Sequence, residues 1–88
     1  MKTVKQLEQY FKGIANHRRI EILVLVNKQA GISLEQMAGQ LNCSFKTLSE
    51  HTRRLVHAGF MEKKYQGRQV AHTLLPCGKK IVKIIQSF

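Results

Sequence analysis

The chain has 88 residues, which is enough for one domain with one modest core. Apolar residues make up 43% of it, a share typical of folded globular proteins and unlike that of disordered chains. It carries 15 Lys and Arg residues against 5 acidic residues, all of them Glu, for a formal net charge of +10. So large a positive charge on so small a body favours a polyanionic partner, either a nucleic acid or an anionic membrane surface.

Charged residues interrupt every apolar run, so no segment is expected to span a bilayer. The first residues, M-K-T-V-K-Q-L-E-Q-Y, lack the apolar core of a secretory signal. A cytoplasmic, reducing compartment is therefore expected, with Cys43 and Cys77 as free thiols. The cysteines and histidines are scattered without the short spacing of metal ligands, so no metal and no other cofactor is expected.

Residues 3–14 are predicted to form an amphipathic helix. Its apolar side chains recur at spacings of three and four residues, at Val4, Leu7, Tyr10, Phe11 and Ile14. This face is wide for a short terminal helix, so it packs either on the domain's own core or on a second copy of the chain.

A second helix is predicted from an Asn16 cap to about Lys28. The run I-E-I-L-V-L-V at residues 20–26 suits a strand equally well, but the cap and the charged flanks favour a buried central helix. The basic residues at its start contact either a phosphate or only solvent; they are His17, Arg18 and Arg19.

Residues 32–42 contain the next predicted turn and helix. Ile32 is expected in a short strand, and Ser33 with Gln36 fits a capping box in front of a helix over residues 34–41. Asn42 suits the left-handed conformation that ends such a helix.

Residues 44–59 are predicted to form the helix around which the chain is organised. Ser44 is its N-cap, and Gly59 ends it. Its buried stripe consists of Leu48, Thr52, Leu55 and Val56. The opposite face carries basic groups and hydroxyls that suit phosphates and base edges, although a solvated surface helix is the plain alternative. Together with the preceding helix it gives a helix-turn-helix.

Two short strands are predicted after Gly59, separated by a turn at residues 66–69. Such a hairpin is a wing whose tip places Arg68 beside the minor groove of a duplex. Pro76 suits the first turn of a last helix, whose basic side leaves a membrane surface as an alternative partner. The predicted fold is mainly α with a small β-hairpin, a winged helix-turn-helix of order α-α-(β)-α-α-β-β-α in a single domain of residues 1–88.

From about residue 15 to residue 78 the chain resembles the ArsR-like winged-helix transcriptional regulators. The stretches that carry the resemblance are A-N-H-R-R-I-E-I-L, S-L-E-Q-M-A-G-Q-L-N-C-S-F-K-T-L-S-E-H-T-R-R-L-V-H-A-G-F-M-E and Y-Q-G-R-Q-V-A-H-T-L. The stretch L-L-P-C-G-K-K is also similar to the start of the last helix in MarR-like regulators.

This resemblance implies a DNA-binding transcriptional regulator, a repressor that acts as a homodimer on an inverted-repeat operator in double-stranded DNA. The residues expected to contact DNA or to cap the reading helix are Ser44, Phe45, Lys46, Thr47, Ser49, Glu50, His51, Arg53, Arg54, Lys64 and Arg68. The residues expected in the dimer interface, on the first and last helices, are Val4, Leu7, Tyr10, Phe11, Ile81, Ile84, Ile85 and Phe88.

Three positions depart from the family pattern. Phe45 stands where polar residues are common and is expected to meet a thymine methyl. Glu50 stands where Arg is frequent, so it either accepts from cytosine or weakens phosphate binding, and Thr52 replaces a usual Leu. The familiar metal sites of the family are absent, since residues 34–41 contain no Cys, His or Asp and residues 77–88 contain no His or acidic residue.

A winged helix that binds protein, without specific DNA readout, is the alternative. An enzyme is not expected, because there is no Asp, the glutamates are dispersed, and no phosphate loop or nucleophile motif is present. No effector is specified by the sequence: Cys43 beside the reading helix is compatible with a redox switch, and an inert buried thiol is the simpler interpretation.

Overall fold

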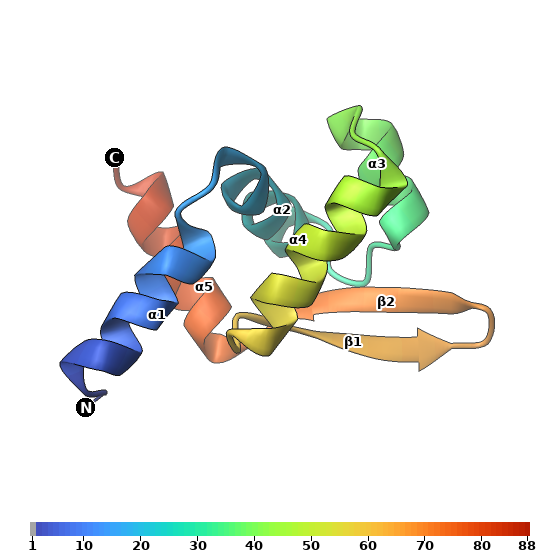
Figure 1. Cartoon of the computed structure of the whole chain (residues 1–88). Helices are drawn as coiled ribbons and strands as arrows, with labels where there is room; N and C mark the ends of the chain where they lie inside the picture. Colours follow the sequence, from blue (N-terminus) through green and yellow to red (C-terminus); the bar gives the residue numbers. More distant parts are fainter. Residues whose placement is uncertain (1) are drawn as a thin grey trace.

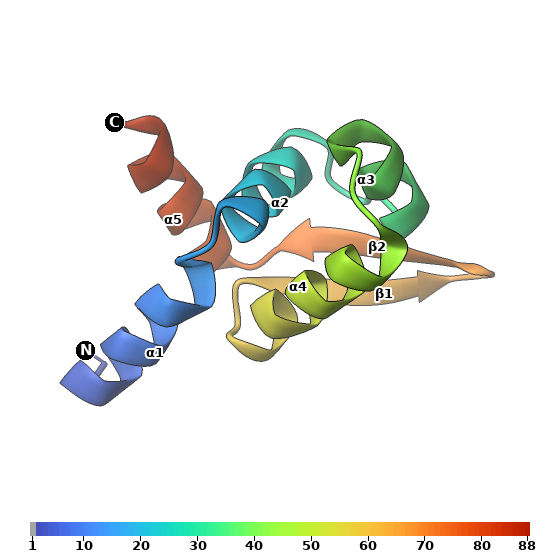
Figure 2. The ribbon, with the colours of Figure 1, turned by 45° about the horizontal axis from the view of Figure 1, so that its top comes forward.

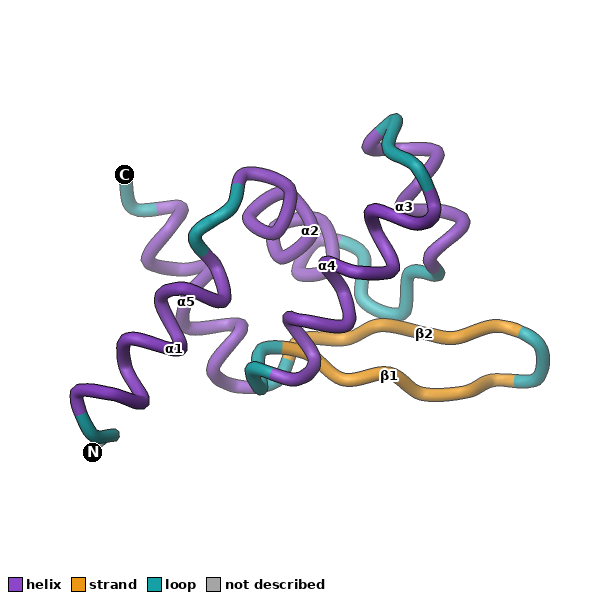
Figure 3. Tube along the Cα trace, viewed as in Figure 1, coloured by secondary structure: helices purple, strands orange, loops and turns teal. Residues whose placement is uncertain are grey.

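The computed structural model describes residues 2–88, where five helices pack together and one two-stranded antiparallel hairpin extends from them (Figure 1). Along the chain the elements are α1 (Val4–Ile14), α2 (His17–Lys28), α3 (Leu34–Leu41), α4 (Phe45–His57), β1 (Met61–Gln66), β2 (Gln69–Leu74) and α5 (Pro76–Gln86). The tube view shows the helices gathered together while the hairpin projects from them (Figure 3). The predicted fold class and element order are therefore confirmed.

Side-chain caps fix where the helices begin, as the sequence predicted. Asn16 accepts from the backbone amides of Arg18 and Arg19, and Ser33 forms a complete capping box with Gln36. The ambiguous run at residues 20–26 is helical. Asn42 ends α3 in the left-handed conformation, with φ of 50°, and so allows the tight turn into α4.

The hydrophobic core lies where α2, α3, α4 and the base of the hairpin meet. Ile22 and Leu23 of α2 are fully buried, together with Met37, Leu48 and Phe60 from the surrounding elements. Each such side chain contributes roughly 1.5–3 kcal/mol by leaving water. Helix α2 is less buried than the predicted central helix. Ile20, Val24 and Leu25 are only half-buried and line an open groove.

The hairpin turn is tighter than predicted. Gln66 pairs with Gln69, so only Gly67 and Arg68 connect the strands. Gly67 has φ of 63°, and a glycine in this first position allows the two-residue turn whose twist matches that of the strands. The predicted short strand at Ile32 is a single bridge to His72, which ties the hairpin to the segment in front of α3.

The terminal helices α1 and α5 lie at the end of the molecule away from the hairpin tip (Figures 1 and 2). Tyr10 of α1 packs edge-on against Phe60, with ring centroids 4.5 Å apart. Gly78 in the first turn of α5 is buried directly against the backbone of Phe60. Within residues 2–88, no helix has the length and apolar character needed to cross a membrane.

Candidate nucleic-acid interface

Helix α4 exposes the face that the sequence predicted to be its outer face, because the opposite face is buried in the core. Leu48 and Leu55 are completely buried, and Thr52 is 1% exposed. The Thr52 hydroxyl donates to the Ser49 carbonyl at 3.0 Å, so this departure from the family pattern leaves no unpaired polar group. Lys46 and Ser49 consequently point to solvent.

The first turn of α4 combines a cap with an exposed aromatic side chain. The Ser44 hydroxyl accepts from the Thr47 amide at 3.2 Å and donates to the Thr47 hydroxyl at 2.8 Å. Ser44 therefore has a structural role, as the sequence indicated. Phe45 is 49% exposed, which leaves its ring available to a partner.

A cleft of about 160 Å³ separates α4 from the hairpin. Phe45 and Ser49 line it from the helix, while Tyr65 and Arg68 line it from the hairpin. The structure therefore brings Arg68 to the same surface as the first half of α4. Lys64 lies elsewhere: strand residues alternate between faces, and its ammonium group is 3.7 Å from Glu62 on the other face of the hairpin.

Glu50 is engaged by two neighbours on its own helix. Its carboxylate accepts from Arg53 at 2.8 and 3.2 Å and from Arg54 at 3.1 Å. These hydrogen bonds lower the pKa of the Glu50 carboxyl to about 2. The side chain therefore offsets part of the positive charge of both arginines, which supports the prediction of weakened phosphate binding over that of a cytosine contact.

His51 is half-buried, and its ring contacts α2. Its Nδ1 accepts from Arg19 Nε at 3.2 Å, so the proton of the neutral ring is on Nε2. Burial lowers the pKa of His51, and the charges of Arg19 and Arg54 lower it further. His51 thus helps to hold α4 against α2, and its contact with DNA stays a prediction.

The basic residues at the start of α2 also have structural partners. Arg18 donates to the Leu41 carbonyl at 3.1 Å and lies 3.5 Å from Glu21. Arg19 donates to the carbonyl oxygens of Lys12 and Gly13 at 3.1 and 3.0 Å, which satisfies the last turn of α1. These contacts join segments distant in sequence, and periodicity within one helix gives no signal for them.

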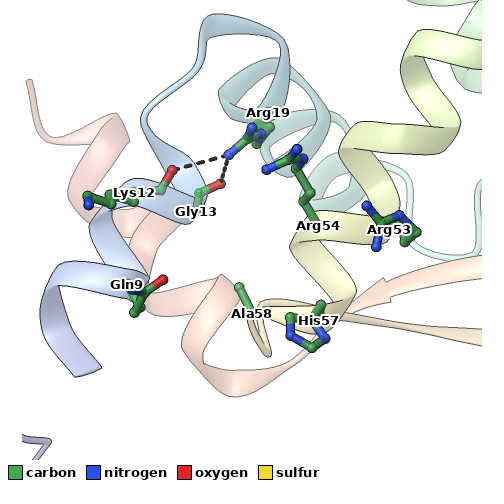
Figure 4. Close-up of a pocket in the computed structure, with 8 residues that line it drawn as sticks. All are labelled: Gln9, Lys12, Gly13, Arg19, Arg53, Arg54, His57 and Ala58. Atoms are coloured by element: carbon green, nitrogen blue, oxygen red, sulfur yellow. Dashed lines mark hydrogen bonds between the residues drawn. The ribbon is translucent and has the colours of Figure 1, made fainter. Parts of the chain in front are cut away.

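Sequence reasoning missed a second cavity on α4. It has a volume of about 370 Å³ and lies between the second half of α4, the end of α1 and the start of α2 (Figure 4). The residues that line it are Gln9, Lys12, Gly13, Arg19, Arg53, Arg54, His57 and Ala58. Arg53 and Arg54 were expected to contact DNA, and Arg19 was expected to meet either a phosphate or only solvent, but nothing in the sequence indicated that these residues line one cavity.

The predicted dimer-interface residues fall into two groups. Val4, Phe11, Ile84 and Phe88 are 85%, 58%, 54% and 102% exposed, and Leu7 is 36% exposed. Tyr10, Ile81 and Ile85 are half-buried within the chain itself. A hydrogen bond with the Cys77 thiol is the main cause that raises the pKa of Tyr10 to about 12. Cys43 and Cys77 are both free thiols.

Helices α3 and α4 are joined by a tight turn, α4 is basic and exposed on its outer face, and the hairpin flanks it. This arrangement is a winged helix-turn-helix of the kind found in transcriptional regulators. The sequence profile of the MarR family matches residues 15–66, more than half of the chain, and the chain belongs to that family. The predicted ArsR-like assignment is supported only in part. A possible ArsR-family regulator has a similar fold, whereas the sequence profile that matches is that of the MarR family.

Solved structures of similar fold cover nearly the whole chain. The transcriptional regulator HlyU from Vibrio vulnificus CMCP6 is 26% identical, with a TM-score of 0.82 over 94% of this chain and 86% of that one. The homodimeric winged helix-turn-helix domain of Mb0332 from Mycobacterium bovis, described as a possible ArsR-family regulator, is 22% identical, with a TM-score of 0.86 over 96% and 78%. The transcriptional repressor PagR of Bacillus anthracis is 18% identical, with a TM-score of 0.83 over 93% and 94%. No curated protein sequence matches the chain significantly.

Proposed function

We propose that this protein is a sequence-specific double-stranded DNA-binding transcriptional regulator that represses its targets as a homodimer. One arrangement supports this function: Phe45 and Ser49 of α4 and Arg68 of the hairpin line a single solvent-exposed cleft. In this assignment α4 enters the major groove and Arg68 reaches the adjacent minor groove, whose narrow form attracts guanidinium groups.

The two halves of α4 have different chemistry, and base readout belongs to the first half. Lys46, Thr47 and Ser49 are exposed there, and no carboxylate of residues 2–88 forms an ion pair with Lys46. Phe45 offers apolar contact to a thymine methyl. In the second half, Arg53 shares Glu50 with Arg54, so it contributes phosphate attraction of reduced strength.

Dimerisation through the terminal helices follows from the apolar side chains that α1 and α5 leave exposed. Phe11 and Phe88 are large, and burying each against a second copy is worth roughly 1.5–3 kcal/mol. Mb0332, of similar fold, is described as homodimeric. A two-fold dimer places its reading helices in successive major grooves, so the operator is an inverted repeat with half-sites about 34 Å apart.

Repression is the simplest outcome for a domain of this size, because a bound dimer excludes other proteins from the same stretch of DNA. PagR, which shares the fold, is described as a repressor. The winged helix that binds protein without specific DNA readout is the alternative, and in that function the positive charge serves solubility.

Selection of bound sites from random duplex DNA tests the function directly. An inverted repeat should be enriched, and the affinity of the selected duplex should fall steeply with salt as counterions are released. The double variant Arg53→Glu with Arg68→Glu should lose most of this affinity. Failure of the wild-type chain to bind any duplex at low salt, or unchanged affinity of the double variant, would favour the protein-binding alternative.

A further inference from the structure

The cavity beside the second half of α4 continues into a neighbouring hollow. That hollow has a volume of about 320 Å³ and shares Gln9, His57 and Ala58 with the cavity. Lys2 also lines this hollow, and its ammonium group lies 4.5 Å from the centroid of the Tyr10 ring. We call the combined feature the α1–α4 groove; its lining residues lie on α4, α1, the residues before α1 and the start of α2.

The charge of the α1–α4 groove has one sign. Lys2, Lys12, Arg19, Arg53 and Arg54 line it, and no carboxylate does so within residues 2–88. The close-up shows Arg19 and Arg54 approaching one another above the cavity, with His57 and the Gln9 amide below (Figure 4). The ammonium group of Lys12 points away, so it forms part of the rim (Figure 4). Glu50 offsets part of the charge of Arg53 and Arg54, and Glu8 lies 3.7 Å from Lys12. Arg19 and Lys2 therefore supply the positive charge that no carboxylate of residues 2–88 neutralises, and this charge is suited to an anion.

The groove is also held in place before any ligand arrives. The Arg19 guanidinium is fixed by Lys12, Gly13 and His51, through hydrogen bonds of 3.1, 3.0 and 3.2 Å. No carboxylate in residues 2–88 forms an ion pair with Arg19. Its charge is therefore both oriented and uncompensated, which lowers the ordering cost of binding a phosphate.

Position identifies the phosphate source. A helix in the major groove lies between the two phosphate backbones that border that groove. The hairpin tip lies beside the first half of α4. The α1–α4 groove lies beside the second half of α4, at the end of the molecule that carries α1 and α5 (Figures 1 and 4).

We propose that the α1–α4 groove is a second DNA contact, which binds phosphodiester groups of the duplex on the side of the reading helix opposite the wing. This assignment rests on the proposed DNA-binding function and extends the contact surface toward the centre of a dimeric operator. Gln9 and His57 become DNA-binding residues, and Arg54 binds the backbone through the guanidinium nitrogens that Glu50 leaves free.

The test is the variant Gln9→Glu, which keeps the side-chain size and places a carboxylate where the phosphate would bind. Gln86→Glu is the matched control, since it makes the same chemical change on the exposed end of α5, away from the groove. Affinity for the selected duplex is measured by fluorescence anisotropy over a range of NaCl concentrations. Gln9→Glu should weaken binding at least about tenfold and reduce the salt slope by about 0.9 per protomer, while Gln86→Glu should do neither.

A second measurement locates the phosphates. Ethylation of backbone phosphates near the operator centre should interfere with binding by the wild-type protein but not with binding by Gln9→Glu. Identical interference patterns, or equal affinities of Gln9→Glu and Gln86→Glu, would overturn the second contact while leaving the proposed function intact. If the wild-type chain binds no duplex at all, both assignments fail.

A free anion is the other possible occupant of such a site. Inorganic phosphate is therefore titrated into the free protein, with the His57 ring signals followed by NMR. Binding of inorganic phosphate that Gln9→Glu abolishes, combined with unchanged DNA affinity in that variant, would assign the groove to a small anion and overturn the DNA contact.

Discussion

Replacing Gly78 by Ala should destabilise the protein because a side chain has no room at this position. A Cβ atom there would lie 2.1 Å from the Phe60 carbonyl oxygen and 3.3 Å from the Leu74 side chain. An ordinary carbon–oxygen contact needs about 3.3 Å, so α5 and Phe60 must separate by about 1 Å. The same carbonyl accepts from the Leu75 amide at 2.9 Å, so it cannot move freely.

The expected loss follows from three contributions. Overpacking of a buried position costs about 1–3 kcal/mol, and a weakened hydrogen bond from Leu75 costs about 1 kcal/mol. The better helix propensity of Ala offsets up to about 1 kcal/mol. The free energy of unfolding should therefore fall by about 1–4 kcal/mol, which for a domain of this size lowers Tm by roughly 4–30 °C.

Gly39→Ala is the matched control for Gly78→Ala. Gly39 lies within α3 and is exposed, and a Cβ atom there would meet nothing within 4 Å. The same substitution should therefore stabilise the protein by about 0.5–1 kcal/mol. Urea and thermal unfolding followed by circular dichroism measure both variants. Equal Tm values for the two variants would refute the claim that close approach to Phe60 makes Gly78 necessary.

Glu50→Gln should release its two arginine partners, raise affinity for duplex DNA and steepen its dependence on salt; a lower affinity in the anisotropy titration would instead indicate that Glu50 contacts a base. Arg68→Gln should reduce the salt slope by about 0.9 per protomer and leave Tm unchanged, because the side chain is exposed on the hairpin tip. Burial lowers the pKa of His72, so the stability that depends on its neutral ring is fully present above the unfolded pKa of about 6.5 and is lost as pH falls toward the lower folded pKa. Urea unfolding of the wild-type protein should show this loss, and His72→Gln should flatten the pH profile; equal slopes in both proteins would contradict it. Asn42→Ala should cost about 1–2 kcal/mol because Ala disfavours a φ of 50°, whereas Asn42→Gly should cost less in the same unfolding assay.

Local sequence signals predicted most of the fold. Asn16 and Ser33 marked helix starts through their capping chemistry, and Asn42 marked the tight turn through its tolerance of positive φ. The hairpin connection was predicted too long because four polar residues occupy positions 66–69, and composition alone does not separate strand ends from the turn. Only the paired backbone positions of Gln66 and Gln69 make that distinction.

The candidate site was predicted less completely, because its decisive contacts connect distant parts of the chain. His51 has the spacing of an outward-facing residue, yet its partner Arg19 lies 32 positions earlier. Helical periodicity indicates which residues share a face of the helix, but it does not indicate which other segments pack against that face. The α1–α4 groove was invisible for the same reason, since three helices and the N-terminal segment each contribute part of its lining.

The bridge between Ile32 and His72 couples the position of the hairpin to that of α3. Gly31 donates to the His72 carbonyl at 2.9 Å, and the amide of His72 donates to the Ile32 carbonyl at 3.1 Å, so the base of the hairpin is joined to the segment that leads into α3. Arg68 lies four residues from His72, about 13 Å along an extended strand, so a tilt of about 10° at the bridge would move Arg68 by about 2 Å. A displacement of α3 would therefore be passed to the hairpin tip, where a shift of about 2 Å is enough to break a hydrogen bond between Arg68 and a phosphate.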